Sequence, residues 1–300
     1  MSELESADGA EPGRDEAGPG AGSGGGDGRG DGPIRLGGMA MRNGLLIHGP
    51  TSWAAATRTA DGRIEVASGS KPTLSQGRIG SVPMLRGPVR LAEAMLVIPL
   101  VKLRLRSARL PFQDPRVVAA GALSSALTAL VRRHGSAGPR EELIASLIGI
   151  LPALTALRDH DLAAYHGVEH KAIGAYETGG SIEAAPKEHQ RCGSNLIAPL
   201  VVLSTAGQLI LERTLASPGP LSRGAVAVAG MGASVELFAN AERRPGSVLG
   251  RAVHVPGHEI QRLLSTREPT PTQLEIGDAA LRAILAAEGV VDRRGEASLR

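Results

Sequence analysis

The chain has 300 residues, of which 42% are hydrophobic, so it has enough apolar side chains to build a buried core. A formal net charge of +3 with only 2% aromatic residues argues against nucleic acid as a partner. Nucleic-acid surfaces need clustered Lys and Arg, usually with stacking aromatics. The single cysteine, Cys192, excludes an intramolecular disulfide and is typical of a reducing compartment.

The first 33 residues are rich in glycine and carry almost no apolar side chains, as in GAGSGGGDGRGDG. Such a segment cannot offset the entropy cost of ordering, so we predict a disordered tail over residues 1–33. It begins with acidic residues and has no apolar h-region, which argues against a secretory signal.

Residues 34–88 are predicted to form a small β-rich element. The stretch RIEVAS alternates apolar and polar side chains, and Asp61-Gly62 is a hairpin-turn dipeptide between two such runs. Proline and glycine in residues 80–88 predict a turn, and a helix is expected to follow over about 91–105.

Residues 89–240 are predicted to form an apolar helical bundle. Four segments lack charged residues: 117–131, 143–157, 194–211 and 224–235. Crossing a hydrocarbon core takes about 20 apolar residues, and only 194–211 approaches that length. Basic residues at the segment ends and small residues spaced four apart favour a membrane bundle, whereas the missing aromatic belt favours a soluble one.

Residues 241–288 are predicted to form a C-terminal helical segment, followed by a polar tail over 289–300. Thr272 and Glu275 have the spacing of a capping box. Leu274, Leu281 and Leu285 then form an apolar stripe, which predicts an amphipathic helix that ends near residue 288.

A histidine motif in residues 165–177, YHGVEHKAIGAYE, predicts a metal site. His166 and His170 are four positions apart, so on a helix their rings lie on one face, close enough to share an ion. The order H-x-x-E-H is that of the inverted zincins. In such sites the two histidines bind zinc and the glutamate, here Glu169, acts as general base on a metal-bound water.

Further ligands must come from outside this helical turn. Glu177 lies about 10 Å further along the axis of an unbroken helix, which is too far. His189 and Cys192 lie in a loop before the next helix. There the helix dipole and Arg191 would lower the pKa of the thiol, which suits Cys192 to be a ligand or a nucleophile.

Three interpretations of this site follow from the residues. In the first, the ion of a zinc hydrolase is held by His166, His170 and either Cys192 or His189. In the second, all four form a closed structural site in a non-enzymatic scaffold. In the third, Cys192 is the nucleophile of a metal-free enzyme with a histidine base. Gly167 within the motif weakens a helix by about 1 kcal/mol relative to alanine, and access to a substrate backbone is one reason for a glycine at this position.

A second histidine pair, His254 and His258, has the same spacing. Pro256-Gly257 lies between them, so we expect the helix that would align the rings to be broken and both residues to lie in a loop.

Several motifs together resemble the bacterial YqhQ family of unknown function. They are GPTSWAAATRTADGRI, VPMLRGPVRLAEAM, YHGVEHKAI, RCGSN and QRLLSTREPTPTQLEIGDAAL, and they cover about residues 37–287. The resemblance implies a multi-pass membrane protein with a metal site at His166, Glu169, His170 and Cys192, and it brings no established reaction. This chain departs from the family at NGLLIHGP, where the family has EGVMMRGP, and at PGHEIQ, where it has PGLWLQ.

Taken together, we predict a mainly α fold with a small N-terminal β element, a membrane-embedded helical bundle and a C-terminal amphipathic helix. The expected function is that of a metal-dependent membrane enzyme, a hydrolase with a divalent ion, zinc, as cofactor. The lipid bilayer is the expected partner. An even number of crossings and basic flanks predict that the N-terminus, the histidine loop and the C-terminus are cytoplasmic.

Overall fold

A computed structural model describes residues 33–134 and 138–290 of the chain. They belong to one unit, Pro33–Arg300. The predicted fold, mainly α with a small N-terminal β element, is confirmed. A disordered tail is expected over residues 1–33, and residues 1–32 of it lie outside the described residues. The expected polar tail also lies outside them from residue 291 onward.

The β element is a four-stranded antiparallel sheet in the order β1-β2-β3-β4. Its turn at Gly62 has a positive φ of 89°, which glycine adopts without strain, as the Asp61-Gly62 dipeptide predicts. The strands are β1 (Gly37–Met41), β2 (Gly44–His48), β3 (Ser52–Arg58) and β4 (Ile64–Ser70).

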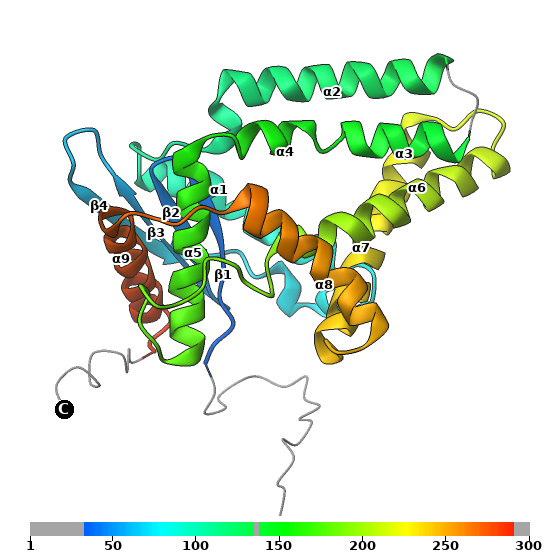
Figure 1. The fold of residues 1–300 in the computed structure, drawn as a ribbon. Helices are drawn as coiled ribbons and strands as arrows, with labels where there is room; N and C mark the ends of the chain where they lie inside the picture. Colours follow the sequence, from blue (N-terminus) through cyan, green and yellow to red (C-terminus); the bar gives the residue numbers. More distant parts are fainter. Residues whose placement is uncertain (1–32, 135–137, 291–300) are drawn as a thin grey trace, which may run out of the picture. The chain divides into compact units, whose positions relative to one another are not determined.

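Both faces of the sheet are covered, because successive side chains of a strand point to opposite sides. On one face Leu45 and Ile47 pack in a core with α5 (His160–Thr178) and α9 (Pro271–Ala287). On the other, Leu46 and Trp53 pack against Val97 of α1 (Arg86–Arg104). Figure 1 shows α5 and α9 together beside the strands.

The C-terminal helix α9 is the predicted amphipathic helix, and its apolar stripe is buried at Leu281 and Leu285. The prediction of a capping box at Thr272 and Glu275 was wrong, because the box lies two residues earlier in the chain. Thr270 is the N-cap and Gln273 completes the box, because the proline that follows Thr270 occupies the first helical position, where its missing N–H costs nothing.

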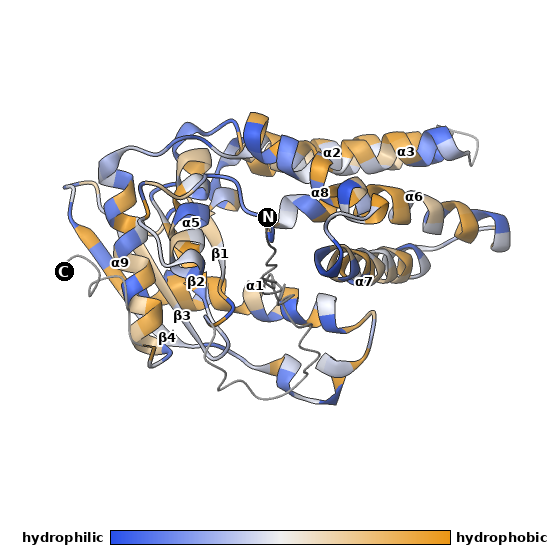
Figure 2. Ribbon diagram, turned by 60° about the horizontal axis from the view of Figure 1, so that its bottom comes forward, coloured by the Kyte–Doolittle hydropathy of each residue, from blue (hydrophilic) through white to orange (hydrophobic). Residues whose placement is uncertain are grey.

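Six further helices form the rest of the described chain, and α2, α3 and α6 are mainly hydrophobic in Figure 2. The segment predicted as one helix over 143–157 is two helices, separated at Gly149 and Ile150. The helices are α2 (Pro115–His134), α3 (Pro139–Ile148), α4 (Leu151–Ala156), α6 (Ile197–Thr214), α7 (Pro220–Arg243) and α8 (Val248–Ile260).

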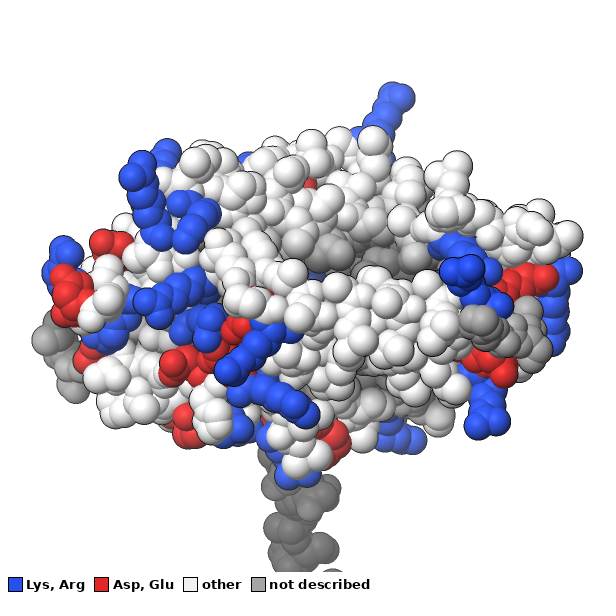
Figure 3. Space-filling model, turned by 90° about the horizontal axis from the view of Figure 1, so that it is seen from above, with Lys and Arg blue, Asp and Glu red and all other residues white. Residues whose placement is uncertain are grey.

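Two helical segments are long and apolar enough to cross a membrane, Gly193–Thr214 and Pro220–Arg243. Only 28% and 22% of their apolar windows are buried inside the protein, so most of this apolar surface needs another cover. The second helix has 24 residues and extends well beyond the short apolar run 224–235. In Figure 3 a broad face without charged side chains lies between two charged ends.

The expectation that His254 and His258 lie in a loop was wrong. Helix α8 runs through Pro256 to Ile260 without a break. The proline removes one backbone donor but does not stop the helix, because tight packing holds it: a side chain at Gly257 would clash with Asn195.

Candidate metal centre

Helix α5, which carries the histidine motif, belongs to the protein core. Its N-cap Asp159 accepts hydrogen bonds from the backbone of Asp161 and Leu162, and Gly179 ends it in the left-handed conformation with φ 69°. Twelve of its 19 residues are buried, and it packs on β1, β2 and α9. Although α3, α4 and α5 together pass a length and hydropathy test, they bend by 91°, and we treat α5 as lying outside the membrane.

The structure brings three candidate donors together. His166, His170 and Cys192 each offer one ligand atom, and these atoms all lie within 4.8 Å of one another. The two imidazole centroids are 4.4 Å apart, and Sγ of Cys192 lies 3.5 Å from Nε2 of His166. The H-x-x-E-H spacing places both rings on one side of α5, and the loop from α5 to α6 returns the thiol to them.

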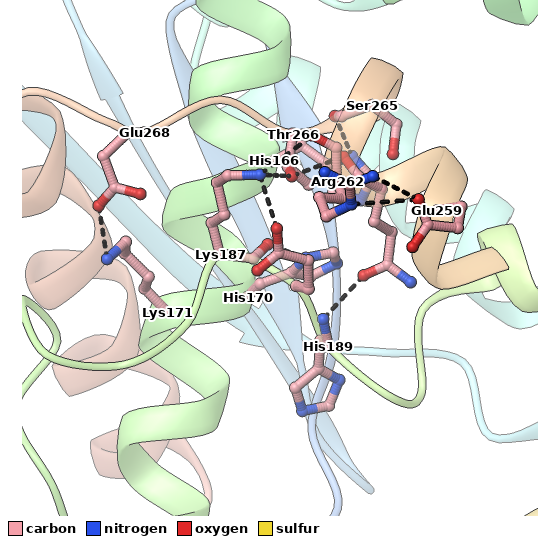
Figure 4. Close-up of polar contacts among 12 residues, drawn as sticks. His166, His170, Lys171, Lys187, His189, Glu259, Arg262, Ser265, Thr266 and Glu268 are labelled. Carbon is pink, nitrogen blue, oxygen red and sulfur yellow. Dashed lines mark hydrogen bonds and ion pairs between the residues drawn. The ribbon is translucent and has the colours of Figure 1, made fainter. Parts of the chain in front are cut away.

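Hydrogen bonds orient both rings for metal binding. Nδ1–H of His166 donates to the carbonyl of Ser265 at 2.8 Å, and Nδ1–H of His170 donates to the carbonyl of Lys187 at 2.6 Å. A carbonyl only accepts, so each Nε2 keeps its lone pair. Nε2 of His170 is buried with no hydrogen-bond partner among the described residues, as expected of a ligand atom without its ion. Figure 4 shows His166 beside Ser265.

Cys192 is held at the start of the 3-10 turn Gly193–Leu196 that leads into α6. Its sulfur accepts the backbone N–H of Ser194 at 3.5 Å. Arg191, expected to stabilise the thiolate, instead forms an ion pair with Glu177. Cys192 is partly exposed, which leaves the thiol open to reagents.

His189, the fourth candidate ligand, lies outside the three-donor group. Its Nε2 is 3.1 Å from a carboxylate oxygen of Glu177, and its Nδ1 accepts the backbone N–H of Arg191 at 3.3 Å. Its ring centroid is 5.8 Å from that of His170. Glu177, as expected from its spacing, does not reach the donor group; it fastens the loop through His189 and Arg191 instead.

Glu169 is buried next to the donors but is not one of the three. Burial raises the pKa of its carboxyl above the ordinary value, opposed by the nearby rings of His166 and His189. Gly38 of β1 leaves the space that this side chain fills, since a Cβ there would lie 2.7 Å from Cγ of Glu169. Burial also lowers the pKa of His170, which keeps that ring neutral. The arrangement suits Glu169 to exchange protons beside the donors.

The close approach that accounts for Gly167 is to the protein's own backbone. A Cβ at this position would lie closer than 3.0 Å to the carbonyl oxygen of Arg267. The backbone N–H of Arg267 in turn donates to the carbonyl of Ala163 at 3.0 Å. The missing side chain therefore lets the 265–267 segment lie against α5, and this segment supplies the carbonyl that orients His166.

The fold and this site define a mainly helical protein with two candidate membrane spans and a His/His/Cys donor group beside a buried glutamate. Residues 144–287 match the model of a family described as proteins of unknown function, DUF1385, which is consistent with the uncharacterised YqhQ-like family. The matched segment contains α5, the Cys192 loop and α9. Comparisons with curated proteins and with solved structures gave no match.

Proposed function

We propose that this protein is a metal-dependent membrane enzyme, a hydrolase, in which His166, His170 and Cys192 hold a divalent ion, zinc. Glu169 is the general base. The proposal depends on one observation: three donors converge, and the described residues place no fourth donor with them. Three protein ligands with one position left open are typical of catalytic zinc, whereas structural zinc has four.

A divalent ion held by His166, His170 and Cys192 would supply a Lewis acid to polarise a substrate oxygen and ease deprotonation of water. The chain supplies the rest. The carbonyls of Ser265 and Lys187 fix both rings, and Glu169, whose pKa is raised by burial, takes up and returns a proton.

A metal-free thiol enzyme is the second candidate, because Sγ of Cys192 lies 3.5 Å from Nε2 of His166. The non-enzymatic scaffold with a closed four-ligand site has less support, since both ring nitrogens of His189 have other hydrogen-bond partners.

Zinc content of the purified protein tests the proposal. We expect about one zinc per chain in the wild type and close to none in His166→Ala, His170→Ala or Cys192→Ser. His160→Ala is the matched control, because His160 is an exposed histidine at the start of the same helix. Negligible zinc in the wild type would end the metal hypothesis.

His189→Ala separates catalytic from structural zinc. We expect it to retain zinc, whereas a closed four-ligand site would lose it. Glu169→Gln should also retain zinc and lower hydrolysis by about 10²- to 10⁴-fold, as expected for loss of a general base.

We further propose that Gly193–Thr214 and Pro220–Arg243 cross the membrane as a hairpin, with the metal centre and both termini on the cytoplasmic side. In a Cys192→Ser background, an impermeant thiol reagent added to intact cells should label Ser217→Cys, in the exposed turn between these helices. It should leave Ser70→Cys, at the exposed end of β4, unlabelled. The reverse pattern would invert this topology.

A further inference from the structure

A cleft of about 1180 Å³ opens beside the donor group. Its lining comes from β1, β2 and α1, from the C-terminal parts of α5 and α7, from His254 of α8 and from the 186–191 loop. Figure 1 shows these elements. The volume exceeds that of a small ion and suits an organic ligand.

Positive charge dominates the lining. Three of its four carboxylates are already engaged: Glu177 with Arg191, Glu188 with Lys187, and Glu93 with the backbone and hydroxyl of Ser75. Six basic side chains line the same cleft: Arg35, Lys71, Arg86, Arg90, Arg191 and Arg243. An excess of guanidinium groups over free carboxylates favours an anionic ligand.

Three of these arginines, Arg35, Arg90 and Arg243, are exposed and form no hydrogen bond or close ion pair within the described residues. Arg243 has one acidic neighbour: the hydrogen bond from Arg86 and, to a lesser extent, the charge of Arg243 lower the pKa of Glu236. Burial, and then repulsion by Arg35, lowers the pKa of Arg191, which shows that two guanidinium groups lie near one another. His48 adds no charge, because burial and then Lys71 lower its pKa to about 4.

One further hydrogen-bonding group in the wall of the cleft has no hydrogen-bond partner among the described residues. His254 is a lining residue, and its buried Nδ1 has no hydrogen-bond partner within the described part of the chain. Buried polar atoms are normally paired, so an unpaired one in the wall of a cleft indicates a ligand atom or water that completes it.

The cleft and the donor group are neighbours along two segments. Gly174 lines the cleft and lies four residues, about one helical turn, beyond His170 on α5. Arg191 lines the cleft and immediately precedes Cys192. A ligand bound by the arginines would therefore lie against a wall of the cleft that adjoins His170 and Cys192.

We infer that this cleft binds the phosphate group of a phosphate-bearing substrate through Arg35, Arg90 and Arg243. A phosphate has enough charge and oxygen atoms to engage more than one guanidinium, whereas a carboxylate is satisfied by one fork. The phosphate site is inferred from the residues that line the cleft. That its ligand is a substrate rests on the proposed function.

The phosphate can belong to a soluble phosphoester or to a lipid headgroup. Val235, Phe238 and Arg243, near the end of the candidate span α7, line the cleft, so a lipid in the adjoining leaflet would present its headgroup there. The two sources share the same phosphate chemistry and are separated by the choice of probe.

Calorimetric titration of the full-length protein in detergent tests the inference. The probes are glycerol 3-phosphate and short-chain phosphatidic acid, with short-chain phosphatidylcholine as the zwitterionic control. We expect the triple variant Arg35→Gln, Arg90→Gln, Arg243→Gln to weaken phosphate binding by about tenfold or more. Arg116→Gln is the matched control, because Arg116 is exposed and lies outside the cleft, and within the described residues only its backbone N–H, not its guanidinium, forms a hydrogen bond.

Binding of phosphatidic acid alone assigns a lipid headgroup, and binding of glycerol 3-phosphate assigns a soluble ligand. The inference is overturned if neither probe binds better than phosphatidylcholine, or if the triple variant binds like the wild type. Zinc content, measured on the same samples, should be unchanged in the triple variant and so reports that it is folded.

Failure of the two proposals is distinguishable. Arginine-dependent phosphate binding in a protein without zinc leaves the cleft site standing and removes the hydrolase. Zinc binding without arginine-dependent phosphate binding removes the cleft site and leaves the metal centre. His166→Ala combined with His170→Ala should retain phosphate binding, because neither residue lines the cleft.

Discussion

Replacing Gly167 by alanine probes the contact that supports the metal centre. The added Cβ would lie closer than 3.0 Å to the carbonyl oxygen of Arg267. Ser265, two residues earlier, accepts the hydrogen bond from Nδ1 of His166 at 2.8 Å. Gly167→Ala must therefore push the 265–267 segment away from α5 and disturb the orientation of that ring.

Two opposing effects set the change in stability. Alanine is favoured over glycine within a helix by about 1 kcal/mol. Overpacking of a close contact costs about 1–3 kcal/mol, and here the obstacle is a backbone carbonyl that cannot rotate away as a side chain would. The clash should win, with a net loss of up to about 2 kcal/mol in the free energy of unfolding. Zinc affinity should fall by about 10- to 100-fold, as for other losses of a ligand's hydrogen-bond partner.

Gly174→Ala is the matched control on the same helix. A Cβ there would meet only Cδ2 of His189, at 4.0 Å, which is ordinary contact. This variant should gain up to about 1 kcal/mol from helix propensity. Denaturant unfolding, followed by the fluorescence of Trp53, the only tryptophan, and zinc competition with a chelating dye measure both effects. If both variants are stabilised alike, the close approach at Gly167 is refuted.

Three further predictions concern the thiol, a buried ion pair and pH. A chelator should speed alkylation of Cys192 several-fold if zinc protects it, whereas a metal-free thiol enzyme should show no change. Arg223→Leu removes the 2.8 Å ion pair of the nearly buried Glu212 and should cost about 3 kcal/mol in the free energy of unfolding; Arg213→Leu, an exposed control, should cost little. Burial lowers the pKa of His48 in the folded state to about 4, below its ordinary value of 6.5, so the unfolded state takes up the proton first as pH falls from about 6.5 to about 4. Stability should drop by up to about 3 kcal/mol across that window, and His48→Gln should remove this part of the slope while leaving stability at pH 8 similar.

The elements that could be predicted from the sequence are those whose signal is local. The turn at Asp61-Gly62 is specified by glycine's freedom to adopt positive φ, and α9 by an apolar stripe. The failures are places where packing overrides a local rule. Pro256 did not end α8, and the helix cap moved to Thr270 because Pro271 favours the first helical position.

The candidate site divides in the same way. Four-residue spacing on a helix is a local signal, and it placed the rings of His166 and His170 together. Whether Cys192 or His189 joins them depends on the path of the 186–191 loop, which spacing does not determine. The carbonyls that orient the rings belong to backbone and leave no mark in the sequence; only the unfavourable glycine at 167 indicated a close neighbour.

The donor group also connects two parts of the protein that differ in surroundings. His166 and His170 lie on α5, within the core shared with the sheet and α9. Cys192 caps the turn that continues directly into α6, a candidate membrane span. An ion bound by all three would therefore link the sheet core to the membrane hairpin. On this reasoning, catalysis and the link between core and span depend on one set of ligands, whereas the arginines of the cleft, which are not ligands, should keep their phosphate site when the ion is lost.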